Sequence, residues 1–434
     1  MPPRPAALAL LAVLVAGRLT AQGSPHLRDR IPELFSFGSC GQPLCLDGSV
    51  NAANGHGDHF LPGVAAGNAS IIGFLTDAIG LNASNFPLSA SGSGQTFRFE
   101  GGLPVKTSTS LGPVFGERAQ TLGKGRLVVG ANVTRVDLNS LRGVPMDKLV
   151  LNFTHADVPG VGRPGLGDPE KENDILQVRL QMYVNLLVST FFATYGVSDR
   201  VDVSVAVPLV HTSLQGRSAA QIYPFGPTAV HFFTGTAENP GLTANAATFG
   251  SATGIGDIAF RGKASLRTAE RFRVAVLADA RLPTGSEADL TGSGHLALRA
   301  LSVVSGRFGD FSPHLNAGYL LRAGTGRADA WLVTAGFDQP VSGWATLAAE
   351  VLSEWQTGGG GLELPGTVTL LYPFVRTVEP TNIPDMKDHR VNGSFGFKFR
   401  TPGGPILVTN ALVPLRRGGL QSSLVWTVGL DLNF

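Results

Sequence analysis

The sequence has few charged residues and, after its N-terminal stretch, no long apolar run. Only 15% of the 434 residues are charged, and a formal net charge of +2 gives no reason to expect nucleic-acid binding. A helix needs about 20 consecutive apolar residues to span a bilayer, so no helical membrane anchor is predicted. In contrast, 56 glycines and 28 prolines argue against long helices and favour many short strands joined by turns.

Cysteine is also scarce, because Cys40 and Cys45 are the only two. Residues 1–21 indicate the compartment in which these two cysteines would lie. An early arginine, an apolar stretch over residues 6–16 and small residues before position 22 are typical of a cleaved signal peptide for export. In an oxidising compartment two neighbouring cysteines can pair, so we predict a Cys40–Cys45 disulfide.

The last fourteen residues alternate between apolar and polar side chains. Successive residues of a strand point to opposite faces, so one face suits lipid and the other suits water. The apolar face holds Leu424, Trp426, Val428, Leu430, Leu432 and Phe434, and the polar face holds Ser423, Thr427, Asp431 and Asn433. The end of this strand resembles the C-terminal signal that the bacterial barrel-assembly machinery reads, through Thr427, Gly429, Leu432 and Phe434.

Similar alternation over about eleven to fourteen residues recurs through the chain, close to the length of a tilted membrane strand. Short turns alternate with longer connections, as they do between the periplasmic and extracellular ends of outer-membrane barrels. We therefore predict an all-β fold, a transmembrane antiparallel up-and-down β-barrel over residues 125–434, with its last strand ending in the periplasm. The twelve predicted strands are 125–136, 174–195, 200–212, 254–267, 271–282, 295–306, 311–322, 329–338, 344–355, 389–400, 405–415 and 421–434.

Some segments leave the count open. Strand-like runs at 148–155 and 366–374 lie inside long predicted loops, so fourteen strands is the alternative. Residues 22–124 lack sustained alternation and contain one short helical candidate, 69–79. We predict that residues 22–124 form an irregular segment before the barrel, either a plug in the lumen or a periplasmic hairpin built from 95–100 and 105–110.

The alternation also predicts which charged side chains line the lumen. A charge that faces hydrocarbon near the bilayer centre is costly, so these side chains must face water or one another. One interpretation is a permeation path with a locally basic wall, and the other is that opposite charges pair across strands and fill a narrow lumen. The candidates are Arg179, Asp257, Arg261, Lys263, Arg273, Asp279, Arg281, Arg299, Glu350, Glu354, Lys398 and Asp431.

Catalytic and metal-binding patterns are weak. His56, Asp58 and His59 lie close together but lack a fourth ligand. His295 follows a Gly-Ser-Gly run that is not a nucleophile elbow. The glycine-rich stretches lack the lysine of a phosphate-binding loop. We therefore expect no enzymatic activity, no bound metal and no cofactor.

Four segments resemble a known family. They are FGERAQTLGKGRL at 115–127, FATYGVSDRVDV at 192–203, GIGDI at 254–258 and DARLPTG at 279–285. They are similar to outer-membrane transporters whose family label refers to the meta-pathway of phenol degradation. The resemblance covers about residues 110–434 and implies a monomeric barrel for uptake of small aromatic or hydrophobic compounds. A looser likeness links the chain to long-chain fatty-acid channels, but the Asn-Pro-Ala motif of their N-terminal hatch is missing.

The function expected from these features is a passive channel in the bacterial outer membrane. Its expected partners are outer-membrane lipid, the barrel-assembly machinery during insertion, and a small-molecule solute that the sequence does not name. The alternative is a structural or surface-interaction barrel, in which the predicted extracellular loops 137–173 and 213–253 bind a partner.

Overall fold

A computed structural model gives the fold. It describes residues 26–37, 66–84, 97–100, 103–106, 110–154, 174–224, 231–236, 238–269, 271–324, 328–358, 362–370 and 374–434. The predicted signal peptide, the Cys40–Cys45 disulfide and the weak metal candidate at positions 56–59 lie outside these residues.

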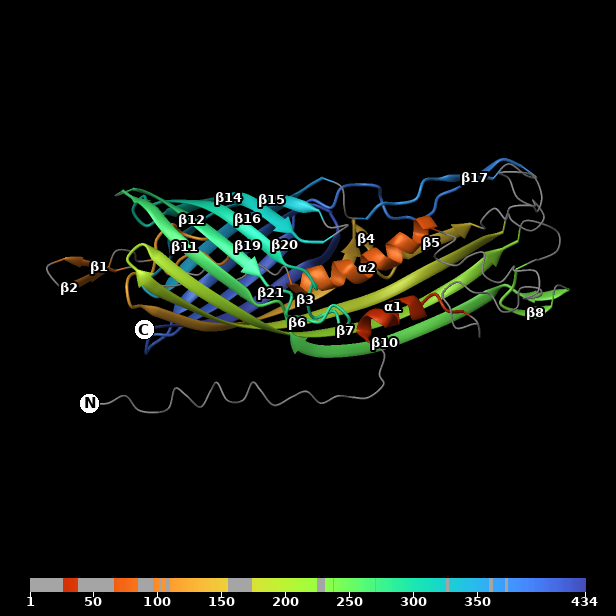
Figure 1. Ribbon diagram of the computed structural model, residues 1–434, viewed down its shortest axis with the longest axis horizontal. Helices are drawn as coiled ribbons and strands as arrows, with labels where there is room; N and C mark the ends of the chain where they lie inside the picture. The colour runs from red at the N-terminus through yellow and green to blue at the C-terminus, as the bar shows by residue number, and fades with distance from the viewer. Residues whose placement is uncertain are drawn as a thin grey trace.

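Twelve antiparallel strands close into a barrel (Figure 1), which confirms the predicted fold class and strand count. The first and last strands, β3 and β21, pair from Val128 with Asn433 to Leu141 with Leu420, so the wall has no open edge. The strands are β3 (Leu127–Leu141), β6 (Ile175–Ser198), β7 (Val201–Tyr223), β11 (Ala259–Thr268), β12 (Phe272–Arg281), β13 (Ala297–Gly306), β14 (Ser312–Arg322), β15 (Asp329–Pro340), β16 (Ala345–Thr357), β19 (Arg390–Arg400), β20 (Ile406–Pro414) and β21 (Leu420–Asn433).

Further strands lie beyond the barrel wall. On the extracellular side β10 (Thr243–Ile255) pairs with β7, β5 (Leu149–Thr154) pairs with β6, and β4 (Val144–Pro145) pairs with β3. The predicted run 148–155 is therefore a strand that extends the sheet above the barrel, not a thirteenth wall strand. Three small hairpins complete the sheets: β1 (Phe97–Glu100) with β2 (Leu103–Lys106), β8 (Thr234–Thr236) with β9 (Asn239–Gly241), and β17 (Val368–Leu370) with β18 (Arg376–Val378).

The prediction of an open loop over 213–253 was wrong. β7 continues to Tyr223, and β10 pairs with it residue by residue from Ile255 to Thr243. β10 is built mainly of Ala, Thr, Ser, Gly and Asn, and so it lacks the β-branched and aromatic residues by which strands are usually identified. Its pairing with β7, rather than its own composition, makes it a strand.

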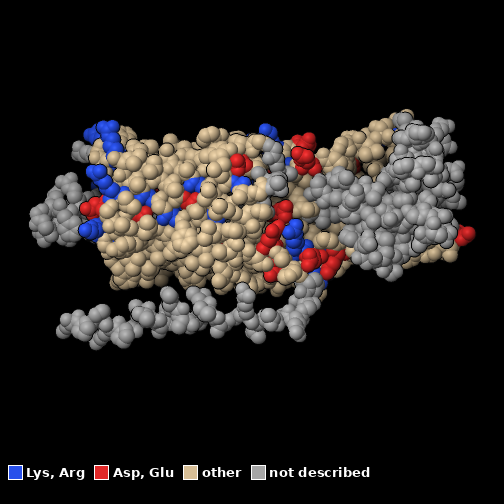
Figure 2. Space-filling model, in the orientation of Figure 1, with Lys and Arg blue, Asp and Glu red and all other residues tan. Residues whose placement is uncertain are grey.

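An apolar belt surrounds the barrel. On the exposed face of the wall, aromatic residues stand near both ends of the strands: Phe308, Phe311 and Trp344 near the short turns, and Trp331 and Trp355 near the other end. About ten residues separate these levels on β15, which at about 3.4 Å per residue and a tilt of about 40° span about 25 Å, the height of the apolar band of an outer-membrane barrel. Figure 2 shows a mostly uncharged barrel surface that is crossed by a row of charged side chains, from the periplasmic end to a cluster near α1.

Ala335 offers a test of this belt, because it is exposed on β15 about midway between the two aromatic levels. Ala335→Arg should lower the free energy of unfolding by about 2–4 kcal/mol, the cost of an arginine facing lipid at the bilayer midplane. Urea unfolding of the protein in vesicles measures the loss. The matched control is Gln339→Arg, exposed near the short turn, for which we expect about 0–1 kcal/mol. Equal losses would contradict the placement of the belt.

β6 extends beyond this belt on the extracellular side. The polarity of its two faces reverses where the strand leaves the belt. Along the strand the even-numbered residues are buried inside, except Phe192 and Ser198, which are half-buried. Within the belt the buried residues include Thr190 and Thr194, whereas the outward residues Phe191 and Tyr195 are apolar. Above the belt the inward residues, from Leu176 to Val188, are apolar, and most of the outward residues, such as Gln177, Arg179 and Gln181, are polar.

The prediction that Arg179 lines the lumen was therefore wrong. Arg179 is exposed on the outer face of β6, where its Nε donates a 3.1 Å hydrogen bond to Gln177 Oε1. The physical reason is that water, not lipid, surrounds the extracellular part of the wall. There the outer face is solvated, and the apolar inner face packs on N-terminal residues.

The N-terminal helices fill this extracellular half. They are η2 (Leu27–Asp29), α1 (Arg30–Glu33) and α2 (Ala66–Ser84), and the predicted helix at 69–79 is thus confirmed but longer. Figure 1 shows α2 along the barrel interior, and it contacts β5, β6 and β21. No helix in the described part of the chain is long and apolar enough to cross a membrane. The buried contacts join Ile31, Leu34, Phe35, Ile71, Leu75 and Ile79 to Phe153, Leu176, Val178 and Leu180.

An inward-folded connection between β12 and β13 fastens the first helical turn. Arg28 donates a 2.8 Å hydrogen bond from Nη1 to Glu287 Oε1. His26 Nδ1 donates a 3.0 Å hydrogen bond to Asp289 Oδ1, and this bond raises the pKa of His26 above its ordinary value. The N-terminal residues are thus attached to the barrel by ion pairs as well as by apolar packing.

Candidate functional site in the barrel lumen

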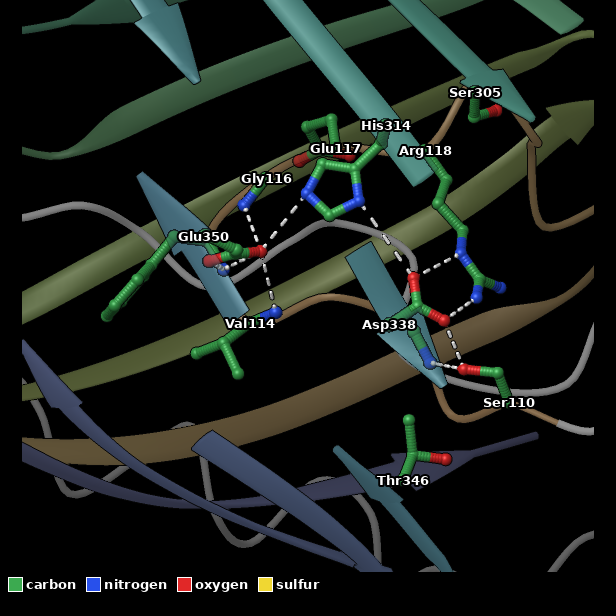
Figure 3. Close-up of polar contacts among 12 residues, drawn as sticks. Ser110, Val114, Gly116, Glu117, Arg118, Ser305, His314, Asp338, Thr346 and Glu350 are labelled. Atoms are coloured by element: carbon green, nitrogen blue, oxygen red, sulfur yellow. Dashed lines mark hydrogen bonds and ion pairs between the residues drawn. The ribbon is translucent and has the colours of Figure 1, made fainter. Parts of the chain in front are cut away.

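Residues 110–119, here called the floor segment, cross the periplasmic half of the lumen. Their backbone amides donate hydrogen bonds to wall side chains of three strands, β13, β14 and β16, and Figure 3 shows the bond from Gly116 to Glu350. The bonds run from Leu111 to Thr346 Oγ1 (2.9 Å), from Gly116 to Glu350 Oε1 (2.9 Å), from Glu117 to Asn316 Oδ1 (2.7 Å) and from Ala119 to Ser305 Oγ (3.1 Å). A loop without secondary structure can be buried here because the wall satisfies its backbone.

Glu350 is the main anchor of the floor segment. Its carboxylate is buried and also accepts hydrogen bonds from the amides of Val114 (3.2 Å) and Phe115 (3.0 Å). His314 Nε2 lies 3.4 Å from Glu350 Oε1. Gly116 is required at this point, because a Cβ would overlap the His314 ring.

The charged side chains of the floor segment meet opposite charges on the wall. Arg118 binds Asp338 with its guanidinium, with Nε 3.0 Å from Oδ1, and Ser110 Oγ donates to the same carboxylate. Glu117 lies 2.5 Å from Arg261 Nη1 and 3.3 Å from Lys263 Nζ. Removing one partner of a buried pair leaves an uncompensated charge, so these contacts hold the segment in place.

A chamber of about 180 Å³ lies between the floor segment and α2. Asn316 lines its lower end and donates a 2.9 Å hydrogen bond to the Glu117 carbonyl. Asn82, in the last turn of α2, lines its upper end. The side walls carry Leu301, Leu320, Leu332, Leu352 and Leu412 together with Asp279, Arg281, Arg299, Glu354 and Arg390.

The carboxylates of the chamber are already paired. Asp279 Oδ2 lies 3.0 Å from Arg299 Nη2 and 3.2 Å from Arg261 Nε, and its Oδ1 lies 3.7 Å from Arg281 Nε. Glu354 Oε1 lies 2.6 Å from Arg322 Nη2. The interpretation that opposite charges pair across strands therefore describes most of these residues, and the chamber is the space that the pairs leave.

The structure separates the predicted lumen residues into groups. Asp279, Arg281, Arg299 and Glu354 meet at the chamber. Arg261, Lys263 and Glu350 contact the floor segment. Lys398 and Asp431 are buried on the inner face of the wall, at about the level of the floor segment. Arg273 occupies an inward-facing position of β12 near a periplasmic turn.

Asp257 has a different environment. Its carboxylate accepts hydrogen bonds from the amides of Gly285 (3.0 Å) and Ser293 (2.9 Å) and from the Ser293 hydroxyl (2.6 Å). It therefore fixes the inward connection after β12 and does not line the chamber.

Several residues of the site were not predicted. Arg390 lies on the same alternation as Lys398, so the sequence pattern could have identified it. Asp338 likewise follows the inner alternation of β15. Glu117 and Arg118 lie outside any strand, and no periodicity indicates them.

The terminal strand keeps the predicted alternation near its end. Thr427 and Gly429 are buried on the inner face, Leu432 faces outward, and Phe434 is exposed. A bulge between Ser422 and Val425 leaves Ser423 exposed instead of inside. The role of these residues in insertion stays a prediction.

The closed wall, its apolar belt and its charged interior define a β-barrel protein of the bacterial outer membrane. Residues 165–363 match the family model described as "Putative MetA-pathway of phenol degradation". This match agrees with the resemblance seen in the sequence. None of the curated proteins matches the chain.

Three solved structures are similar to this chain at low identity. An outer-membrane channel from Pseudomonas putida F1 has 11% identity and a TM-score of 0.40, over 73% of this chain and 98% of that one. A deltaS2 mutant of the TodX monoaromatic hydrocarbon channel has 10% identity and a TM-score of 0.32, over 73% and 91%. A Pseudomonas aeruginosa FadL homologue has 13% identity and a TM-score of 0.30, over 71% and 89%. At these values the likeness identifies no solute.

Proposed function

We propose that this chain is a non-enzymatic channel for the passive uptake of small compounds with a compact aromatic or apolar body. The chamber carries the proposal, because it is a partly apolar space inside a closed barrel, between α2 and the floor segment. The name of the matched family, which refers to phenol degradation, supports an aromatic solute.

In this proposal the described parts of residues 22–124, which are the N-terminal helices and the floor segment, form a gating unit distinct from the barrel of residues 125–434. Hydrogen bonds and ion pairs join the floor segment to the wall. Such contacts can open and close without covalent change. A solute that leaves the chamber toward the periplasm has to displace the floor segment, and one that enters from outside has to pass α2.

Two neutral solutes of nearly equal mass test the function: mandelamide, which carries an aromatic ring, and arabinose, which does not. Stopped-flow light scattering of vesicles follows the swelling that accompanies solute entry. We expect vesicles with the protein to take up mandelamide faster than protein-free vesicles, and arabinose at nearly the protein-free rate. Equal acceleration of both solutes would contradict selectivity for apolar bodies. No acceleration of either would contradict a channel and favour a barrel whose extracellular extension binds a partner.

A further inference from the structure

The chamber combines two kinds of wall. Leucines of five strands, from β13 to β16 and from β20, supply an apolar side. Arg281, Arg299 and Arg390 supply three positive charges, against the two carboxylates of Asp279 and Glu354. An amphipathic molecule with one negative charge would match both sides.

Two of these arginines have hydrogen-bonding capacity left over. Arg390 forms no ion pair with a described carboxylate, and its Nη1 donates a long 3.4 Å hydrogen bond to Asn82 Oδ1. The Nε atoms of Arg299 and Arg390 are buried and have no hydrogen-bond acceptor among the described residues. A guanidinium has five N–H donors, and a buried donor without an acceptor is destabilising.

Neither a cation nor an anion with two negative charges fits the chamber as well as an anion with one. Asp279 and Glu354 are engaged by arginines, so an ammonium group would find no unpaired carboxylate and would face three positive charges. A dianion would place excess negative charge beside the leucines. A cavity of about 150 Å³ can hold benzene, so about 180 Å³ suits one ring with a small substituent.

We propose that the chamber binds a small monocarboxylate with an apolar body the size of a single aromatic ring. Its carboxylate accepts hydrogen bonds from Arg299 and Arg390, and its ring packs against Leu301, Leu332 and Leu352. This inference rests on the proposed function, since it names the class of solute that the channel recognises.

Calorimetric titration of the detergent-solubilised full-length protein tests the proposal with three ligands that share a ring: benzoate, benzyl alcohol and benzylamine. We expect benzoate to bind at least about tenfold more tightly than benzyl alcohol, and benzylamine to bind most weakly, because charge-assisted hydrogen bonds to arginine are the strong ones. Arg390→Gln should weaken benzoate binding about tenfold and leave benzyl alcohol binding nearly unchanged.

Two further variants guard against misfolding as the cause. Glu354→Gln removes a competing negative charge from the chamber and should tighten benzoate binding several-fold, a gain that misfolding cannot produce. Arg179→Gln is the matched control, because this arginine lies on the outer, solvated face of β6 and should have no effect on benzoate.

The outcomes separate this inference from the channel itself. Equal affinity for benzoate and benzyl alcohol, or an unchanged benzoate affinity in Arg390→Gln, would overturn the carboxylate site even if mandelamide crosses the vesicle membrane. Preferential benzoate binding that is lost in Arg390→Gln would establish the site, even if solute uptake fails and the channel has to be abandoned.

Discussion

Replacing Asp338 by alanine should open the periplasmic end of the lumen and raise the ion conductance of the protein at least tenfold. Asp338 is fully buried and binds both Arg118 and Ser110 of the floor segment. Its loss leaves the Arg118 guanidinium buried without this carboxylate. Breaking a buried pair in this way costs about 3–5 kcal/mol, and each 1.4 kcal/mol is a factor of ten in an equilibrium. Planar-bilayer recordings in concentrated KCl measure the change.

The control for this experiment is the next residue in β15. Gln339 is exposed on the opposite face, so Gln339→Ala should keep the conductance of the unaltered protein. Asp338→Asn keeps an acceptor for Ser110 and should give an intermediate conductance. All three variants should migrate as folded barrels when they are unheated in gel electrophoresis. A folded Asp338→Ala barrel with unaltered conductance would mean that the floor segment is not the barrier.

The barrel could be predicted from the sequence because lipid imposes a strict rule on it. Every wall strand in the bilayer must alternate, and an even number of strands must close. The alternation at 389–400 and 421–434 therefore identified β19 and β21 nearly to the residue. Ten of the twelve predicted lumen charges follow the same rule, whereas Asp257 lies between two strands and Arg179 faces outward.

Alternation does not, however, say which face meets lipid. In β6 the same even-numbered face is inside throughout, but its fully buried side chains change from threonines in the bilayer to apolar residues above it. A rule that assigns every apolar residue to the lipid-facing side places Phe191 correctly. It places Leu180 on the outside and Arg179 on the inside, and both of these assignments are wrong. The position of the membrane boundary decides the assignment, and it follows from tertiary structure.

The floor segment could not be predicted for a different reason. Its residues have no periodicity, and each becomes fixed only by a side chain far away in the sequence, such as Glu350 for Gly116 or Asp338 for Arg118. The sequence resemblance over 115–127 marked the segment as distinctive but did not indicate its contacts. The chamber, which depends on this floor, was out of reach for the same reason.

The reversal of polarity in β6 predicts that adjacent residues differ sharply in their effect on stability. Leu180 is buried on the inner face, opposite Leu149 of β5 and within the core that includes the N-terminal helices. Leu180→Ala should lower the free energy of unfolding by about 2–5 kcal/mol, the cost of a cavity in a packed core. Gln181 is exposed to solvent, so Gln181→Ala should change it by less than about 0.5 kcal/mol.

Urea unfolding followed by circular dichroism compares the two variants under identical conditions. Since the residues are neighbours on one strand, differences in strand propensity or membrane depth cannot account for a large gap between them. The expected order requires that the wall above the bilayer encloses an apolar core. A greater loss for Gln181→Ala than for Leu180→Ala would instead place the polar face of β6 inside, and Arg179 with it in the lumen.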